Sequence, residues 1–147
     1  MKIVGIIPSR MESKRLPGKP LLKIGKKSMI QRVYESSIKC NKLNDVYVAS
    51  DNEDIINHVK LFGNVIKTSS KPINGTERVY EAYLKLQKKY DFIINIQGDE
   101  PFIDPNQIND LIKICNKKND ICTLIKEQKY SDKLNKSSNI KVVINKD

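Results

Sequence analysis

The sequence predicts an α/β fold, in which a mainly parallel, twisted sheet carries helices on both faces. Short apolar runs alternate along the chain with amphipathic helical segments, which is typical of repeated βαβ units. The first run, KIVGIIP, is apolar nearly throughout. A strand with this composition is expected to be buried on both faces, as in a parallel sheet.

The predicted strands are short runs rich in Ile, Val and Phe, most of them bounded by polar, Gly or Pro residues. They cover residues 2–8, 45–50, 64–68, 91–97, 120–126 and 140–147. Because helical segments separate most of them, their carboxyl ends should meet at one edge of the sheet, where such folds bind ligands.

The predicted helices combine an apolar stripe at helical spacing with a polar residue that can cap the first turn. They cover residues 29–40, 52–62, 77–89 and 106–118. Ser28, Asp51 and Thr76 are the expected N-caps of the first three helices. Asp104 is expected to cap the fourth, with Pro105 at its first position.

Length and composition indicate one domain with a substantial core. The 147 residues are 39% hydrophobic and 30% charged, as is ordinary for a soluble protein. No apolar run approaches the roughly 20 residues of a membrane span, and the N-terminus does not resemble a signal peptide. Cys40, Cys115 and Cys122 form no CxxC pair, which favours reduced thiols in or near the core. We therefore expect a cytoplasmic protein without membrane insertion.

The formal net charge of +10 raises the alternative of nucleic-acid binding, because clustered cations neutralise phosphates. Lysines, however, occur throughout the chain, and aromatic residues do not alternate with them as on a base-stacking surface. We expect no nucleic-acid partner, and a basic nucleic-acid binder is the third-ranked alternative.

A basic loop, PSRMESKRLPGKPLLKI, follows the first predicted strand directly. A loop rich in Pro and Gly can present backbone N–H groups to an anion, while Lys and Arg add charge and bidentate hydrogen bonds. It is neither a Walker A loop nor a GxGxxG turn. A triphosphate site is predicted, with a solvated basic loop as the alternative. The cations of this loop that are expected to hold the phosphates include Arg10, Lys14, Arg15 and Lys19.

Two further loops should lie at the same edge of the sheet. In QGDEP, Asp99 follows an apolar strand and is a candidate Mg²⁺ ligand beside phosphate oxygens, although Gly, Asp and Pro also form turns unaided. In NGTER, Thr76 stands beside Glu77 and Arg78 at a predicted helix N-terminus, where it serves at least as a cap.

The three stretches IIPSRMESKRLPGKPL, NGTER and NIQGDEPFI resemble the signatures of the 3-deoxy-manno-octulosonate (Kdo) cytidylyltransferase family, also called CMP-Kdo synthetases. The resemblance covers essentially the whole chain. It implies a Rossmann-like nucleotidyltransferase fold, a homodimer and the use of CTP and Kdo to make CMP-Kdo and pyrophosphate for lipopolysaccharide biosynthesis.

The resemblance also implies roles for individual residues. Arg10, Arg15 and Lys19 would contact the phosphates, with Arg15, Lys19 and Asp99 as the catalytic set and Asp99 as the Mg²⁺ ligand. Glu77 and Arg78 would lie on the sugar side. The nucleotide-binding residues would be Pro8, Ser9, Arg10, Asn74, Gly75, Thr76 and Gln97.

The chain departs from the family pattern at several points. Ser9 stands where the family usually has Ala, Asn74 where it usually has Ser, and Ser28 where Pro commonly follows Gly-Lys. Family members also continue past Asp147 into a region that supplies a second metal-binding Asp, much of the Kdo pocket and much of the dimer interface. Residues 1–147 are therefore expected to be the nucleotide-binding part of a cytidylyltransferase domain, truncated at the C-terminus.

Two alternatives to a Kdo cytidylyltransferase rank above nucleic-acid binding. The chain could belong to a cytidylyltransferase acting on a sialic-acid-like sugar, or it could be a nucleotide-binding fragment that lacks catalysis.

Overall fold

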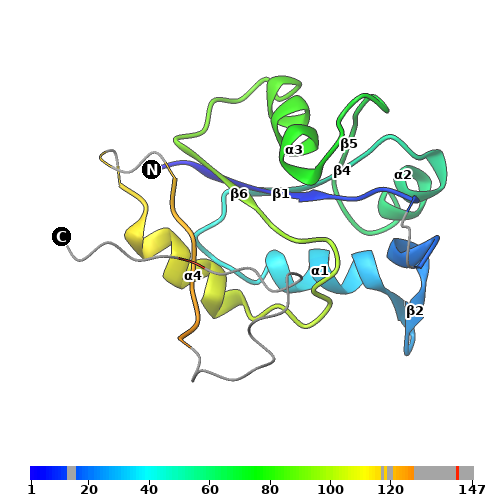
Figure 1. Cartoon of the computed structure of the whole chain (residues 1–147), viewed down its shortest axis with the longest axis horizontal. Helices are drawn as coiled ribbons and strands as arrows, with labels where there is room; N and C mark the ends of the chain where they lie inside the picture. The colour runs from blue at the N-terminus through cyan, green and yellow to red at the C-terminus, as the bar shows by residue number, and fades with distance from the viewer. Residues whose placement is uncertain (13–15, 117, 119–120, 128–141, 143–147) are drawn as a thin grey trace.

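A four-stranded parallel sheet forms the centre of the computed structural model, which describes residues 1–12, 16–116, 118, 121–127 and 142 (Figure 1). The strand order is β5-β4-β1-β6. The strands are β1 (Ile3–Pro8), β4 (Asp45–Ser50), β5 (Val65–Lys67) and β6 (Phe92–Asn95). The predicted parallel sheet is confirmed, with the first strand between β4 and β6.

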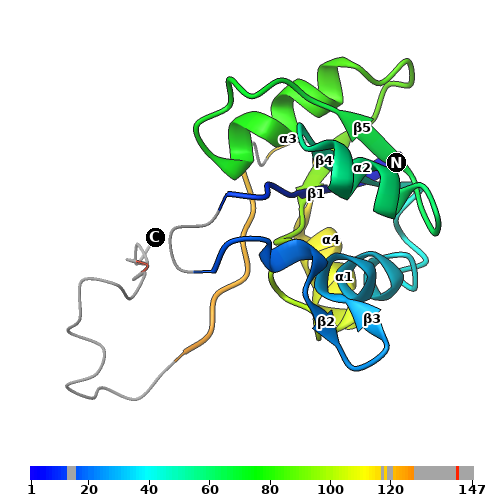
Figure 2. The ribbon, with the colours of Figure 1, turned by 90° about the vertical axis from the view of Figure 1, so that its right-hand side faces the viewer.

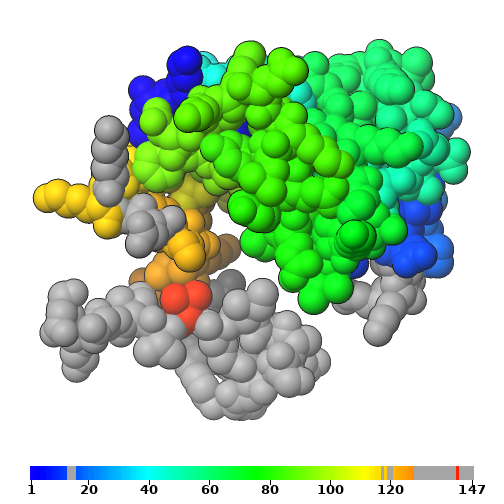
Figure 3. Space-filling view, turned by 90° about the horizontal axis from the view of Figure 1, so that it is seen from above, coloured from blue at the N-terminus to red at the C-terminus, as the bar shows by residue number. Residues whose placement is uncertain are grey.

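Helices cover both faces of this sheet, as predicted (Figure 2). The helices are α1 (Met29–Ser37), α2 (Glu53–Val59), α3 (Gly75–Leu84) and α4 (Pro105–Ile114). Ile3 and Ile7 of β1 pack in one core cluster with residues of α1, α2 and α4. Val4 and Ile6 pack with α3 on the opposite face, which α3 and its neighbouring segments cover in Figure 3. This alternation follows from the two-residue period of a strand.

Two of the four predicted helix caps are wrong by one or two residues. The side chain of Asn52, not Asp51, accepts a hydrogen bond from the backbone N–H of Ile55 at 3.1 Å. Asn74, not Thr76, caps α3, because α3 begins at Gly75 and Thr76 lies inside its first turn. An N-cap must have extended backbone angles immediately before the first helical residue, and the two asparagines occupy those positions.

The other two caps are confirmed. The Oγ of Ser28 accepts a hydrogen bond from the backbone N–H of Gln31 at 3.2 Å. Asp104 caps α4 in a capping box with Gln107, and Pro105 stands at the first helical position. Such boxes satisfy donors that the first helical turn leaves free.

A small hairpin follows the basic loop and was not predicted. A 3-10 turn, η1 (Lys19–Leu21), leads into the antiparallel strands β2 (Lys23–Ile24) and β3 (Lys27–Ser28). Gly18, directly before η1, has φ = 70°, in a region that glycine adopts without steric cost. Lys19 therefore stands on an ordered turn at the end of the loop.

The predicted strand at 120–126 is wrong for the part that the structure describes. Residues 121–127 have no regular secondary structure, and Ile121 is 91% exposed. An apolar run becomes a strand only where a neighbouring strand pairs with it. The predicted strand at 140–147 lies outside the described residues, except for Val142.

Cys40, Cys115 and Cys122 are free thiols, two of them buried and the third partly buried, as predicted. In the described part of the chain, no helix is both long and apolar enough to cross a membrane.

Candidate functional site

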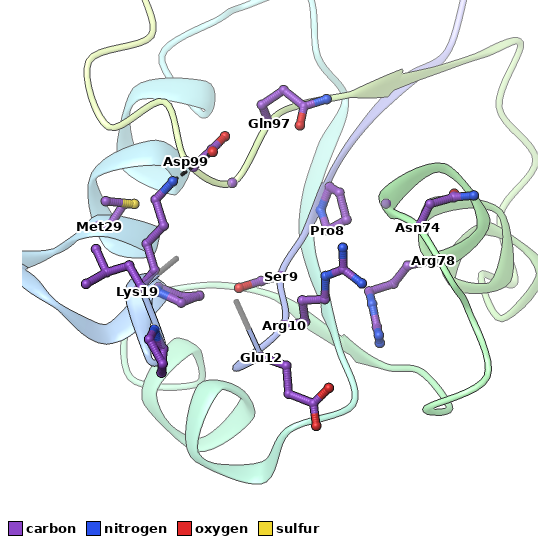
Figure 4. Close-up of a pocket in the computed structure, with 15 residues that line it drawn as sticks. Pro8, Ser9, Arg10, Glu12, Lys19, Met29, Asn74, Arg78, Gln97 and Asp99 are labelled. Carbon is purple, nitrogen blue, oxygen red and sulfur yellow. Dashed lines mark hydrogen bonds and ion pairs between the residues drawn. The ribbon is translucent and has the colours of Figure 1, made fainter. Parts of the chain in front are cut away.

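An open cleft of about 1040 Å³ lies beyond the carboxyl ends of β1 and β6 (Figure 4). The three predicted loops all contribute to it. The first gives Pro8, Ser9, Arg10 and Lys19, the second Asn74, Gly75 and Arg78, and the third Gln97 and Asp99. Nine of the predicted site residues, far apart in the sequence, are thus brought together.

Strand topology explains the position of the cleft. The chain adds β4 and β5 on one side of β1 and then crosses to add β6 on the other side. The loops after β1 and β6 therefore diverge, and ligands bind at such a switch point in parallel α/β sheets. Gly98 lets the loops approach closely, since a Cβ on it would lie 2.7 Å from the carbonyl oxygen of Pro8.

Three predicted site residues are not seen at the cleft. Thr76 and Glu77 lie in the first turn of α3 and do not line it. The carboxylate of Glu77 instead accepts hydrogen bonds from the Ile73 backbone N–H at 3.0 Å and from the Asn74 Nδ2 at 3.2 Å, so Glu77 shapes the loop that carries Asn74. Arg15 lies outside the described residues.

An ion pair connects the first and third loops. The Lys19 Nζ lies 2.8 Å from the Asp99 Oδ2, and the two side chains are 30% and 53% exposed. A half-exposed pair of this kind contributes only about 0 to 1 kcal/mol to stability. Each of the two groups can therefore leave the other and bind a ligand instead.

Arg78 is held from three sides at the wall of the cleft. Its side chain is 5% exposed, and its Nη1 lies 3.1 Å from the Asp51 Oδ1. The same nitrogen donates to the Thr68 Oγ1 at 2.5 Å and to the Ser69 carbonyl oxygen at 3.2 Å. Asp51, which follows β4, was predicted only as a cap. Its place at the carboxyl end of a strand was the signal that it also faces this edge.

The loop beside Arg78 is tied down by Glu81. The Ser69 backbone N–H and Oγ both donate to this carboxylate, at 2.7 and 2.8 Å, and the Lys85 Nζ pairs with it at 2.8 Å. The Lys85 hydrogen bond, helped by those from Ser69 and opposed by burial, lowers the pKa of Glu81 to about 2. The carboxylate is therefore ionised at neutral pH and holds Ser69 in place.

The cleft is lined by side chains of both charges, and its accessible cations are the groups that can hold an anion. Arg10 is exposed, and its Nη1 donates to the Ile73 carbonyl oxygen at 3.3 Å, so it crosses from the first loop to the second. Lys19 adds a second accessible cation, while Asp51 offsets the charge of Arg78.

Sequence reasoning missed several lining residues, most of them apolar, whose only signal was their place in or beside the three loops. They are Glu12, Leu16, Pro17, Pro20, Met29 and Gly98.

A cytidylyltransferase family model matches residues 4–147. The chain belongs to the cytidylyltransferase family. It is 44% identical over 146 residues to the 3-deoxy-manno-octulosonate cytidylyltransferase of Cytophaga hutchinsonii, covering 99% of this chain and 58% of that protein. It is 39% identical over 148 residues to the 8-amino-3,8-dideoxy-manno-octulosonate cytidylyltransferase of Shewanella halifaxensis, covering 97% and 60% of the two chains.

Solved structures of cytidylyltransferases share this fold. A CMP:2-keto-3-deoxy-manno-octonic acid synthetase complexed with CTP superposes with a TM-score of 0.73 at 41% identity, covering 77% of this chain and 46% of that one. The predicted resemblance and the nucleotidyltransferase fold are confirmed. The chain spans about three-fifths of the length of these two curated relatives.

Proposed function

We propose that this chain binds CTP in the cleft and forms the nucleotide-binding part of an enzyme that converts CTP and Kdo to CMP-Kdo and pyrophosphate. The observation that carries the proposal is the convergence of Arg10, Lys19 and Asn74 at the switch point of a cytidylyltransferase fold. A Kdo cytidylyltransferase at 44% identity and a CTP complex of a related synthetase support the choice of nucleotide and sugar.

The reaction requires positioning and charge neutralisation rather than a protein nucleophile. The anomeric hydroxyl of Kdo attacks the α-phosphorus of CTP and gives its proton to water. The bond from that phosphorus to the bridging oxygen breaks, and pyrophosphate leaves. Lys19 and Arg10 would hold the phosphates and offset the negative charge that grows on the leaving group. Arg15 is proposed for the same task from the resemblance.

Mg²⁺ is the proposed cofactor, with Asp99 as its protein ligand. Mg²⁺ at nucleotide sites takes one or two carboxylates together with phosphate oxygens and water. The cleft fits this pattern, because Asp99 is a half-exposed carboxylate beside a cation that can move to the phosphates. No cluster of three or more His, Cys, Asp or Glu side chains suited to a metal occurs among the described residues. We therefore expect the ion to bind together with the triphosphate, whose charge it would help to neutralise.

Asp99→Asn tests the metal site. The substitution keeps the shape of the side chain and removes its charge, so Mg²⁺ should tighten CTP binding less than in the wild type. Without Mg²⁺, CTP affinity should be unchanged or slightly higher, because Lys19 is released from its ion pair. Isothermal titration with and without Mg²⁺ measures both effects. Asp110→Asn is the control. It removes a carboxylate that forms a similar ion pair, 2.7 Å from the Lys113 Nζ, outside the cleft. Equal Mg²⁺ coupling in Asp99→Asn and wild type would contradict the proposal.

Titration with CTP, UTP and ATP, followed by a pyrophosphate-release assay with Kdo, tests the proposed function. Preferential CTP binding is expected. If no nucleotide binds, the proposal is wrong. If CTP binds but no sugar acid makes it release pyrophosphate, the result would favour a nucleotide-binding fragment.

The sugar and the assembly are tested separately. Assays with 8-amino-Kdo and with a sialic acid in place of Kdo would reveal the competing sugar specificities, the first of which the Shewanella relative suggests. The resemblance also implies a homodimer and a cytoplasmic location. Light scattering tests the first, and cell fractionation tests the second.

A further inference from the structure

Ser9 has an unusual hydroxyl at the floor of the cleft. The residue is 5% exposed, and its backbone N–H donates to the Ala49 carbonyl oxygen at 2.8 Å, extending the contact between β1 and β4. Figure 4 shows its side chain directed into the cleft, between Lys19 and Arg10. Among the side-chain nitrogen and oxygen atoms of the described residues, its Oγ is the one that is buried and has no hydrogen-bond partner.

Other buried hydroxyls among the residues that the structure describes have hydrogen-bond partners. The Ser37 Oγ donates to the Val33 carbonyl oxygen at 2.7 Å. The Ser28 Oγ bonds to His58, and the Thr68 Oγ1 accepts from Arg78. A buried hydroxyl without a partner destabilises a protein, because the group has lost water and gained nothing in exchange. The Ser9 hydroxyl therefore requires an explanation that the fold does not supply.

We propose that the Ser9 Oγ–H donates a hydrogen bond to the bound nucleotide and helps to position it. This inference rests on the proposed function, since it names a further contact of the same site. The cleft's accessible cations attract a ligand rich in acceptor oxygens, and such a ligand supplies what the hydroxyl lacks. The ligand reaches the Oγ when neighbouring side chains turn, as interface rotamers commonly do on binding.

Alanine is the natural replacement for testing this hydroxyl. It is the residue that the family resemblance implies at this position, and it removes only the Oγ from a site where the backbone is held by Ala49. Ser9→Ala therefore replaces the residue with one that the fold accepts, and its effect reports on the hydroxyl alone.

Ser9→Ala is expected to weaken CTP binding about two- to tenfold in isothermal titration, as for one neutral hydrogen bond. The melting temperature of the ligand-free protein should stay the same or rise, because an unsatisfied buried group is removed. Ser37→Ala is the matched control. It removes a buried hydroxyl that has a partner, so it should lower the melting temperature and leave CTP affinity unchanged.

Titrations of cytidine, CMP and CTP identify the acceptor. A wild-type to variant affinity ratio that persists for cytidine assigns the contact to the nucleoside, whereas a ratio found only with CMP and CTP assigns it to a phosphate. Equal CTP affinity of Ser9→Ala and wild type overturns the inference and leaves the proposed function standing. Absence of CTP binding by the wild type overturns both.

Discussion

Replacing Lys19 with Ala is expected to weaken CTP binding by about 1.5 to 3 kcal/mol, the range for a hydrogen bond to a charged group. Lys19 is the first residue of the turn η1 and lines the cleft, where its Nζ lies 2.8 Å from the Asp99 Oδ2. Its loss also leaves Asp99 without a counter-charge, which adds repulsion toward a triphosphate. Isothermal titration in the absence of Mg²⁺ measures the combined effect.

The double variant Lys19→Ala with Asp99→Asn separates the two contributions to this loss. It should bind metal-free CTP more tightly than Lys19→Ala alone, since the repelling carboxylate is gone. Lys113→Ala removes a lysine with a comparable 2.7 Å ion pair on α4 and should change nothing. Because the Lys19–Asp99 pair is half-exposed, urea unfolding of Lys19→Ala should differ from wild type by no more than about 1 kcal/mol. If Lys19→Ala binds CTP as tightly as wild type, the loop is a solvated basic surface and not a triphosphate site.

Asp51→Asn is expected to lower the free energy of unfolding by about 2 to 4 kcal/mol, because removing one partner of a buried ion pair leaves the other charge uncompensated. The Arg78 side chain is buried, so its charge would be left away from water without a counter-ion. The estimate stays below the largest values for such pairs because the Asp51 side chain is 25% exposed. Urea unfolding followed by circular dichroism gives the measurement.

Arg78→Met is the companion variant and should destabilise the protein less than Asp51→Asn does. The partly exposed Asp51 carboxylate can be hydrated once its partner is gone, and Met fills part of the space of the arginine stem. The double variant should be more stable than Asp51→Asn alone, since it buries no unpaired charge. If Asp51→Asn has the stability of wild type, the pair does not hold the wall of the cleft.

Much of the candidate site followed from sequence because loop positions in a parallel sheet depend on chain order. Residues that follow strands must gather at one edge, whatever their distance in sequence. Pro8, Asn74 and Asp99 were therefore placed correctly at one cleft. Roles that depend on contacts were harder to predict. The carboxylate of Glu77 holds its own loop, and nothing in its local sequence separates that role from a contact with substrate.

The sequence by itself determined the α/β architecture, because strand burial and helix amphipathicity are periodic properties of neighbouring residues. KIVGIIP is the central strand β1 for this reason. Only the tertiary structure decided which groups are paired. The Asp51–Arg78 contact, the Lys19–Asp99 bridge and the unpartnered Ser9 hydroxyl depend on segments from different strands meeting in space. The apolar run predicted as a strand at 120–126 forms no strand over its described residues, 121–126, since strand pairing requires a partner that local sequence does not reveal.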